Sequence, residues 1–220
     1  MKELLLVNNP KDPFKYSEWF NLDFTNYPVG TTTGFYSNGL TFNRSGVATC
    51  SVVLEDGIPA ISFNGDGAIS ANTTPDKLLN NDWRITLIAK IKASTTNPMI
   101  FVGRSYQSNG SGTWIASLTS TAAMDFWWNA SRGTSTGTIA RDKWYRIIFE
   151  SVGNKLTVYL NTELDDPTPG IAVPGLSGKV IPDLADGTNF PLVIGGSADS
   201  TTYHGRYFLR SLKIETKRRL

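Results

Sequence analysis

The stretch Asp142–Asn161 constrains the fold more than any other part of the sequence. Two runs with apolar residues at every second position flank the polar turn Ser151–Asn154. A period of two around a Gly-Asn turn is typical of an antiparallel β-hairpin, whereas a helix would need apolar residues at positions i, i+3 and i+4. We therefore predict a hairpin here, with one face of each strand in a hydrophobic core.

Further apolar runs follow one another along the chain, separated by clusters of Gly, Asn and Ser. The runs predicted as strands are Ala48–Leu54, Ala60–Phe63, Ala68–Ser70, Ile85–Lys92, Pro98–Arg104, Thr113–Thr119, Ala123–Asn129, Lys143–Glu150, Lys155–Leu160, Leu192–Gly195 and Tyr207–Thr216. Many short strands with turn residues between them favour an all-β sandwich over an α/β fold. In the last run the apolar residues move from odd to even positions between Leu209 and Leu212. We therefore predict a β-bulge near Arg210–Ser211, which would keep the apolar residues on one buried face.

Composition excludes several classes of function. The net charge of +2 provides no basic field for nucleic acid. No apolar run approaches the roughly 18 residues of a membrane span, and Leu4–Val7 is too short for the apolar core of a signal peptide. Cys50 is the single cysteine, so we expect a small buried residue and no disulfide within the chain.

Several motifs resemble those of a known superfamily. The order Trp-x-x-Ile, a Gly-Asn turn and Leu-x-Val-Tyr-Leu-Asn in the hairpin is similar to a hairpin of the laminin G-like and concanavalin A-like jelly rolls. Ala60–Ser70 and Leu192–Ser197 are similar to two further strands of that superfamily, in the same order along the chain. The resemblance implies an antiparallel β-sandwich of jelly-roll type with little helix over residues 46–220. Residues 1–45 would be an N-terminal extension or arm packed on or beside it.

The run Met124–Asn129 suggests a carbohydrate site. If Met124, Phe126 and Trp128 point into the core, the residues between them point to the other face of the sheet. Glycan sites combine an aromatic face for the sugar ring with polar groups for its hydroxyls. The candidate site residues are Trp127, Asp125 and Asn129 on one face, with Tyr106, Trp114 and Arg132 as neighbours. The alternative is that a loop or another chain covers Trp127.

Catalytic and metal-binding patterns are weak in this sequence. Relatives that cleave glucans carry two glutamates and an aspartate spaced Glu-x-Asp-x-x-Glu, and no glutamate here belongs to that complete pattern. No Gly-x-Ser-x-Gly motif precedes an expected helix, so a nucleophile elbow is not predicted either. Asp66 and Asp199 are the only loop candidates for Ca²⁺, which usually needs more than one carboxylate. We therefore predict a protein that is not an enzyme and has no cofactor, with Ca²⁺ as the alternative.

The N-terminal segment is dense in aromatic residues that the jelly-roll pattern does not need. Such residues are enriched at protein interfaces. The candidate interface residues are Phe14, Tyr16, Trp19, Phe20, Phe24 and Tyr27. The alternative is that they fill the core of their own chain. A second unusual segment, Leu164–Asn189, is rich in Pro and Gly, and we predict a long surface loop there.

The resemblance and the missing catalytic set together lead to a functional prediction. We expect a non-enzymatic structural or attachment protein of a larger assembly, specifically a phage virion component such as a capsid decoration, fibre or tail module. Its partners would be other virion proteins and further copies of itself, with a host-surface glycan as an additional ligand. The alternatives are a free carbohydrate-binding lectin, outside the cell or at its surface, and a glycoside hydrolase. The step from fold to virion is an analogy.

Overall fold

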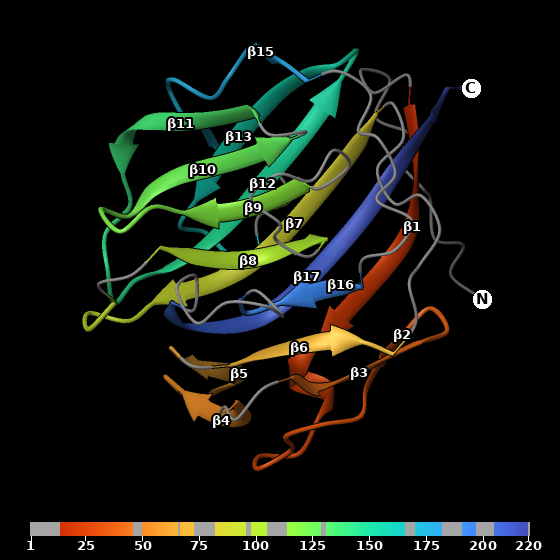
Figure 1. Cartoon of the computed structure of the whole chain (residues 1–220), viewed down its shortest axis with the longest axis vertical. Coiled ribbons are helices and arrows are strands. Elements are labelled where there is room, and N and C mark those ends of the chain that lie inside the picture. The colour runs from red at the N-terminus through yellow and green to blue at the C-terminus, as the bar shows by residue number, and fades with distance from the viewer. Residues whose placement is uncertain are drawn as a thin grey trace, which may run out of the picture.

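The computed structural model describes residues 14–45, 50–65, 67–72, 82–95, 98–104, 114–128, 131–165, 170–181, 191–196 and 205–219. These residues form an antiparallel β-sandwich of jelly-roll type, which confirms the predicted fold class. Two sheets face each other across one hydrophobic core (Figure 1). We call them the front and back sheets, as they lie in Figure 1.

The front sheet joins strands from both halves of the chain. In spatial order it contains β11 (Ser131–Thr138), β10 (Ala123–Trp128), β9 (Trp114–Leu118), β8 (Met99–Arg104), β16 (Leu192–Ile194), β6 (Ala68–Ala71), β3 (Leu40–Ser45) and β2 (Phe35–Ser37). Its strands β8 to β11 follow one another as hairpins, so residues close in sequence share this end of the sheet.

The back sheet is organised around the long C-terminal strand. In spatial order it contains β14 (Ile171–Ala172), β13 (Lys155–Asn161), β12 (Trp144–Val152), β7 (Trp83–Ile91), β17 (Arg206–Arg219), β5 (Ile58–Asn64) and β4 (Ser51–Glu55). Two further strands join it, β1 (Phe14–Asp23) beside β17 and β15 (Lys179–Val180) beside β13. The first half of β17 therefore pairs with β5, and its second half pairs with β1, which runs alongside it in Figure 1.

Two local predictions are confirmed. Strands β12 and β13 form the expected hairpin, and Gly153 and Asn154 in its turn have φ angles of 56° and 61°. Two successive positive φ angles are typical of a type I′ turn, whose twist matches that of the strands. In β17 the pairing with β7 shifts between Leu209 and Ser211, so Arg210 is the extra residue of a bulge. The bulge lets Leu209 and Leu212 both face the core.

The core lies between the two sheets and is rich in aromatic rings. Phe126 of the front sheet stacks on Trp83 of the back sheet with ring centres 5.4 Å apart, and it also contacts Phe149 at 5.7 Å. Phe63 stacks on Tyr207 at 4.8 Å. Large interlocking rings fix the spacing of the sheets because interiors are packed as densely as crystals.

The prediction that Phe20 and Phe24 belong to an interface is wrong. Their exposed fractions are 1% and 0%, and they pack edge-on against Phe42 (5.3 Å) and Phe35 (5.2 Å) of the same chain. A side chain enclosed by its own core has no surface to offer a partner. The alternative, that these aromatics fill the sandwich, applies to both residues.

The other residues of that segment divide into two groups. Tyr27 is half-buried, packs on the core, and its hydroxyl accepts a hydrogen bond from Tyr36 N–H at 2.9 Å. The side chains of Phe14, Tyr16 and Trp19 lie outside the described part of the chain, so the interface remains a prediction for them. Residues 14–45 as a whole contribute β1 to the back sheet and β2 and β3 to the front sheet.

Candidate functional site

The candidate site lies on the outer face of the front sheet, where β9, β10 and β11 run side by side (Figure 1). Along β10 the side chains of Met124, Phe126 and Trp128 are buried in the core, as predicted. Asp125 and Trp127 alternate with them and therefore point to the opposite face. The sequence pattern thus identified the phase of this strand correctly.

Asp125 is the centre of a hydrogen-bonded cluster. Its carboxylate accepts bonds from Trp127 Nε1 at 2.7 Å, from Arg132 Nε at 2.9 and 3.0 Å, and from Thr134 Oγ1 at 2.9 Å. Ser117 Oγ lies at the limiting distance of 3.5 Å. The Asp125 side chain is only 3% exposed, so these donors compensate a buried charge that would otherwise be strongly unfavourable.

Trp127 and Arg132 form the exposed part of the cluster. Arg132 is 43% exposed, and its guanidinium lies over the half-buried Trp127 indole, 4.8 Å from the ring centre. This geometry is a cation–π contact. Because Asp125 holds both side chains, the indole and the guanidinium are oriented before any ligand arrives.

A pocket of about 160 Å³ adjoins this cluster. Its lining includes Trp127, Arg132, Asp125, Ser117, Pro98, Ile100 and Ile115. The lining therefore combines apolar side chains with a hydroxyl, a carboxylate and a guanidinium. A mixed lining of this kind suits a small ligand with an apolar face and a polar edge.

The structure places the other predicted site residues differently. The prediction that Trp114 neighbours the site is wrong. Trp114 pairs with Trp128 across β9 and β10, and it lies in the core with an exposed fraction of 2%. Tyr106 and Asn129, and the Ca²⁺ candidates Asp66 and Asp199, lie outside the described residues.

Sequence reasoning missed Thr134 and Ser117. Thr134 belongs to β11, a strand that was not predicted because Ser131–Thr138 has no apolar alternation. Its inward positions are the small buried residues Gly133 and Ser135. Ser117 lies opposite Asp125 on β9. An alternation of small and polar residues next to a predicted strand would have been the signal for Thr134, whereas Ser117 lies within the predicted strand Thr113–Thr119, whose residues are all buried from Trp114 to Leu118.

The back sheet carries a second tryptophan in a related setting. Trp144 Nε1 donates to Asp56 Oδ2 at 2.9 Å, and Lys90 Nζ donates to the same carboxylate oxygen at 2.8 Å. The hydrogen bonds from Lys90 and Trp144 lower the pKa of Asp56 below its ordinary value. Unlike Asp125, the Asp56 side chain is 55% exposed. Trp144 therefore offers a matched control for experiments on Trp127.

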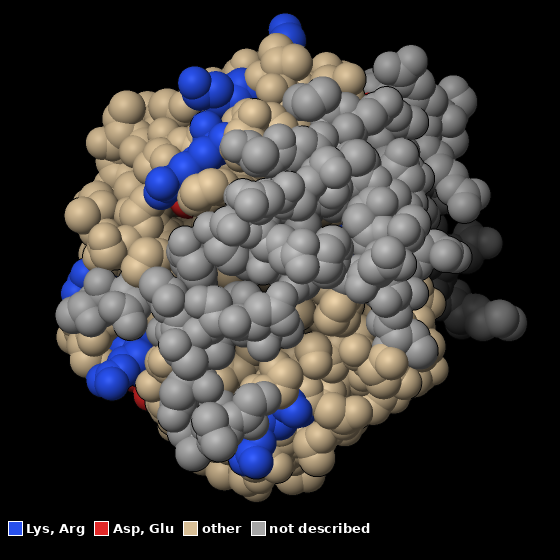
Figure 2. Space-filling view, in the orientation of Figure 1, with Lys and Arg blue, Asp and Glu red and all other residues tan. Residues whose placement is uncertain are grey.

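Charge and metal-ligand clusters add no further candidate among the described residues. Within the described ranges, no three His, Cys, Asp or Glu side chains gather in a way that would hold a metal ion. On the face in Figure 2 the described Lys and Arg side chains form separate groups near the rim and no continuous band. Cys50 is buried, as predicted. Within the part of the chain that the structure describes, no helix has the length and apolarity to cross a membrane.

Comparisons with known proteins identify the fold. No protein-family model matches the sequence, and no curated protein matches it either. Among solved structures, the chain is similar to domain 4 of an extracellular arabinanase from Geobacillus stearothermophilus in complex with arabinotriose. The TM-score is 0.61 at 18% identity, over 92% of this chain and 93% of that one. At this identity the likeness shows a shared fold alone.

Two other neighbours are longer chains. A sialidase from Trypanosoma rangeli matches with a TM-score of 0.60 and 15% identity, over 91% of this chain and 30% of the sialidase chain. The binding domain of botulinum neurotoxin serotype D matches with a TM-score of 0.56 and 15% identity, over 91% of this chain and 48% of that one. This chain therefore spans about a third of the sialidase chain and about half of the toxin domain.

These neighbours correct the prediction that the protein is not an enzyme. The arabinanase and the sialidase are enzymes, so this sandwich occurs within glycoside-cleaving chains. The prediction relied on the carboxylate pattern of one group of relatives, and absence of that single pattern does not exclude catalysis on this fold.

Proposed function

We propose that this chain is a carbohydrate-binding β-sandwich that holds a sugar at Trp127 on the outer face of the front sheet. The observation that carries the proposal is the half-buried indole of Trp127, held by Asp125 and Arg132 beside a pocket with a mixed lining. An aromatic face can pack against the C–H face of a sugar ring, and adjacent polar groups can bond its hydroxyls.

The size of the pocket supports a single sugar ring. A cavity of about 150 Å³ holds benzene, a six-membered ring. The pocket beside Trp127 has about 160 Å³, so one ring of a sugar fits, and the rest of a longer glycan would extend over the sheet surface. Arg132 and Ser117 in the lining carry hydrogen-bond donors.

The fixed orientation of the side chains supports the same proposal. Binding costs free energy when side chains must be ordered by the ligand. Here the Asp125 carboxylate already holds Trp127 and Arg132 through charge-assisted bonds, so little further ordering is required. The structural neighbour in complex with arabinotriose supports an oligosaccharide as the ligand class on this fold.

The test is a glycan array on the whole chain, followed by calorimetric titration of the best oligosaccharide. We expect Trp127→Ala to weaken binding by about tenfold or more, since loss of an aromatic contact of ~1.4 kcal/mol corresponds to a factor of ten. Trp144→Ala removes an equivalent tryptophan–aspartate pair from the back sheet and should leave binding unchanged. Equal affinity for the wild-type and Trp127→Ala chains would overturn the proposal.

The narrower proposal is attachment within a larger assembly. A phage virion role stays a prediction, because none of the neighbours named above is a virion component. If the chain serves attachment, the Trp127 site would make the contact with a host-surface glycan. Light scattering on the isolated chain would measure whether it forms the homo-oligomer that such an assembly requires.

A further inference from the structure

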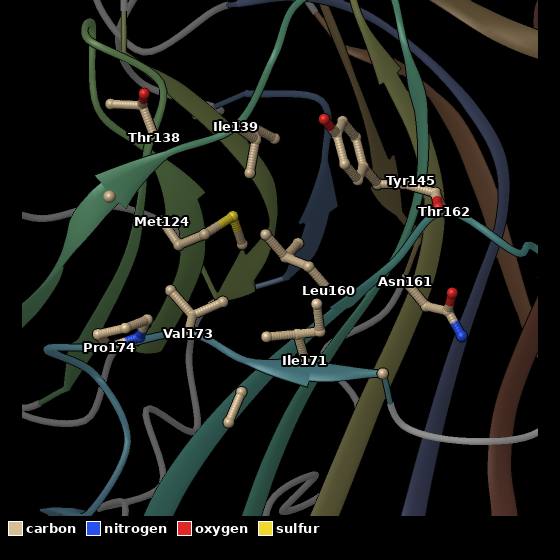
Figure 3. A pocket seen from close by; sticks show the side chains of 13 residues that line it. Met124, Thr138, Ile139, Tyr145, Leu160, Asn161, Thr162, Ile171, Val173 and Pro174 are labelled. Atoms are coloured by element: carbon tan, nitrogen blue, oxygen red, sulfur yellow. The ribbon is translucent and has the colours of Figure 1, made fainter.

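A second and larger pocket, of about 360 Å³, lies at the side of the sandwich between β11 of the front sheet and β13 of the back sheet. Figure 3 shows the side chains of Met124, Leu160, Ile171 and Val173 converging on this space, with Ile139 and Tyr145 on its far side. They come from both sheets and from the segment 170–174. This pocket is separate from the Trp127 site, which lies on the outer face of the front sheet.

The segment 170–174 bridges the two sheets and forms one wall of the pocket. On one side Val173 N–H donates to Val158 O of β13 at 2.7 Å, and on the other Pro174 O accepts from Thr136 N–H of β11 at 3.1 Å. Gly170, with φ +92°, lies so close to Leu160 that a Cβ would collide with its carbonyl. Backbone bonds to both sheets keep the wall in place, so the pocket exists without a ligand.

The inner lining is apolar. Met124, Ile139 and Val173 are almost fully buried, with exposed fractions of 0%, 6% and 5%. Tyr145 adds a hydroxyl that accepts a hydrogen bond from Ala140 N–H at 3.3 Å, so its proton can be donated to another group. Ile171, in contrast, is 80% exposed although it pairs with the inward-facing Leu160.

We propose that this pocket binds a small, largely apolar molecule of about two fused rings that carries one hydrogen-bond acceptor. A cavity of about 150 Å³ binds benzene, and 360 Å³ is roughly twice that size. The ligand would cover Ile171 and place its acceptor at the Tyr145 hydroxyl. A protein partner is disfavoured, since a stable interface buries about 800 Å² on each side and the opening of one pocket offers far less.

Strands β14 and β15, which both pair with β13, provide a matched pair of variants. Ile171 of β14 pairs with Leu160 and lines the pocket, whereas Val180 of β15 pairs with Lys155 and does not line it. A larger side chain at residue 171 therefore fills the pocket, and one at residue 180 stays outside it. Both positions are exposed, so neither change should prevent folding, which urea unfolding would verify.

The experiment is a titration of the whole chain with 2-naphthol, followed by calorimetry and by the NMR signals of the methionine methyl groups. We expect binding to shift Met124 and leave Met99, which packs beside Gly205 at another part of the core, unchanged. Ile171→Trp should weaken binding by about tenfold or more, and Val180→Trp should not change it.

Three results would overturn the proposal. They are no binding of 2-naphthol, equal weakening by the two variants, and a shift of Met99 instead of Met124. If a segment of a second copy of the chain fills the pocket instead, 2-naphthol should not bind, which is the first of these results. Trp127→Ala should bind 2-naphthol as the wild-type chain does, so failure of the carbohydrate proposal would leave this one standing.

Discussion

Replacement of Asp125 by alanine tests the cluster on which the candidate site depends. The change removes the acceptor of Trp127 Nε1, Arg132 Nε and Thr134 Oγ1 in one step. Removal of one partner of a fully buried ion pair costs about 3–5 kcal/mol. Arg132 is 43% exposed and water can solvate part of it, so we expect a smaller loss of about 2–4 kcal/mol.

The assay is urea unfolding followed by tryptophan fluorescence, with wild type and variant fitted to one m-value. Asp165→Ala is the control, because its carboxylate is 87% exposed and lies 3.7 Å from Arg210. That change should alter the free energy of unfolding by no more than about 0.5 kcal/mol. A loss below about 1 kcal/mol for Asp125→Ala would refute the reasoning, since typical surface changes have effects of that size.

Three further predictions concern the core. Gly195→Ala should destabilise the chain by more than about 2 kcal/mol in urea, because φ is +97° and the new Cβ would overlap the Phe63 ring; a smaller loss would mean that the ring moves aside. Burial raises the pKa of Tyr207 well above its ordinary value of about 10, so its contribution to stability is present below about pH 10 and is lost as the pH rises toward the folded-state pKa. Tyr207→Phe should therefore flatten the decline in the free energy of unfolding above about pH 10. A chain that lacks residues 1–45 should fail to give a cooperative unfolding transition, because six core residues from Phe20 to Phe42 at about 2 kcal/mol each approach the whole stability of a domain; a cooperative transition would show the segment to be dispensable.

Much of the fold could be predicted from period-two patterns. The hairpin of β12 and β13 and the bulge at Arg210 both follow from the rule that inward positions must be apolar. Strand β11 could not be found in this way, since its inward residues Gly133 and Ser135 lie at the end of the sheet, where little space remains. Leu176 is within 2.8 Å of where a Cβ on Gly133 would stand.

The candidate site was only partly accessible from the sequence. Asp125 and Trp127 could be placed on one face because Met124 and Phe126 are clearly apolar. Trp114 could not be assigned to a face of the sheet, because every residue of β9 is buried and its sequence shows no alternation of apolar and polar residues. The apolar pocket was not foreseen either, as it depends on backbone bonds from residues 173 and 174 to strands in two different sheets.

The most direct test of the carbohydrate site follows the indole N–H signals of the tryptophans by ¹H–¹⁵N NMR while the best glycan from the array is added. The chain has six tryptophans, so each signal can be assigned by single replacement. The account predicts that the Trp127 signal shifts in proportion to occupancy, whereas those of Trp144 and the buried Trp114 and Trp83 stay in place. A glycan that binds while the Trp127 signal remains unchanged would contradict the account.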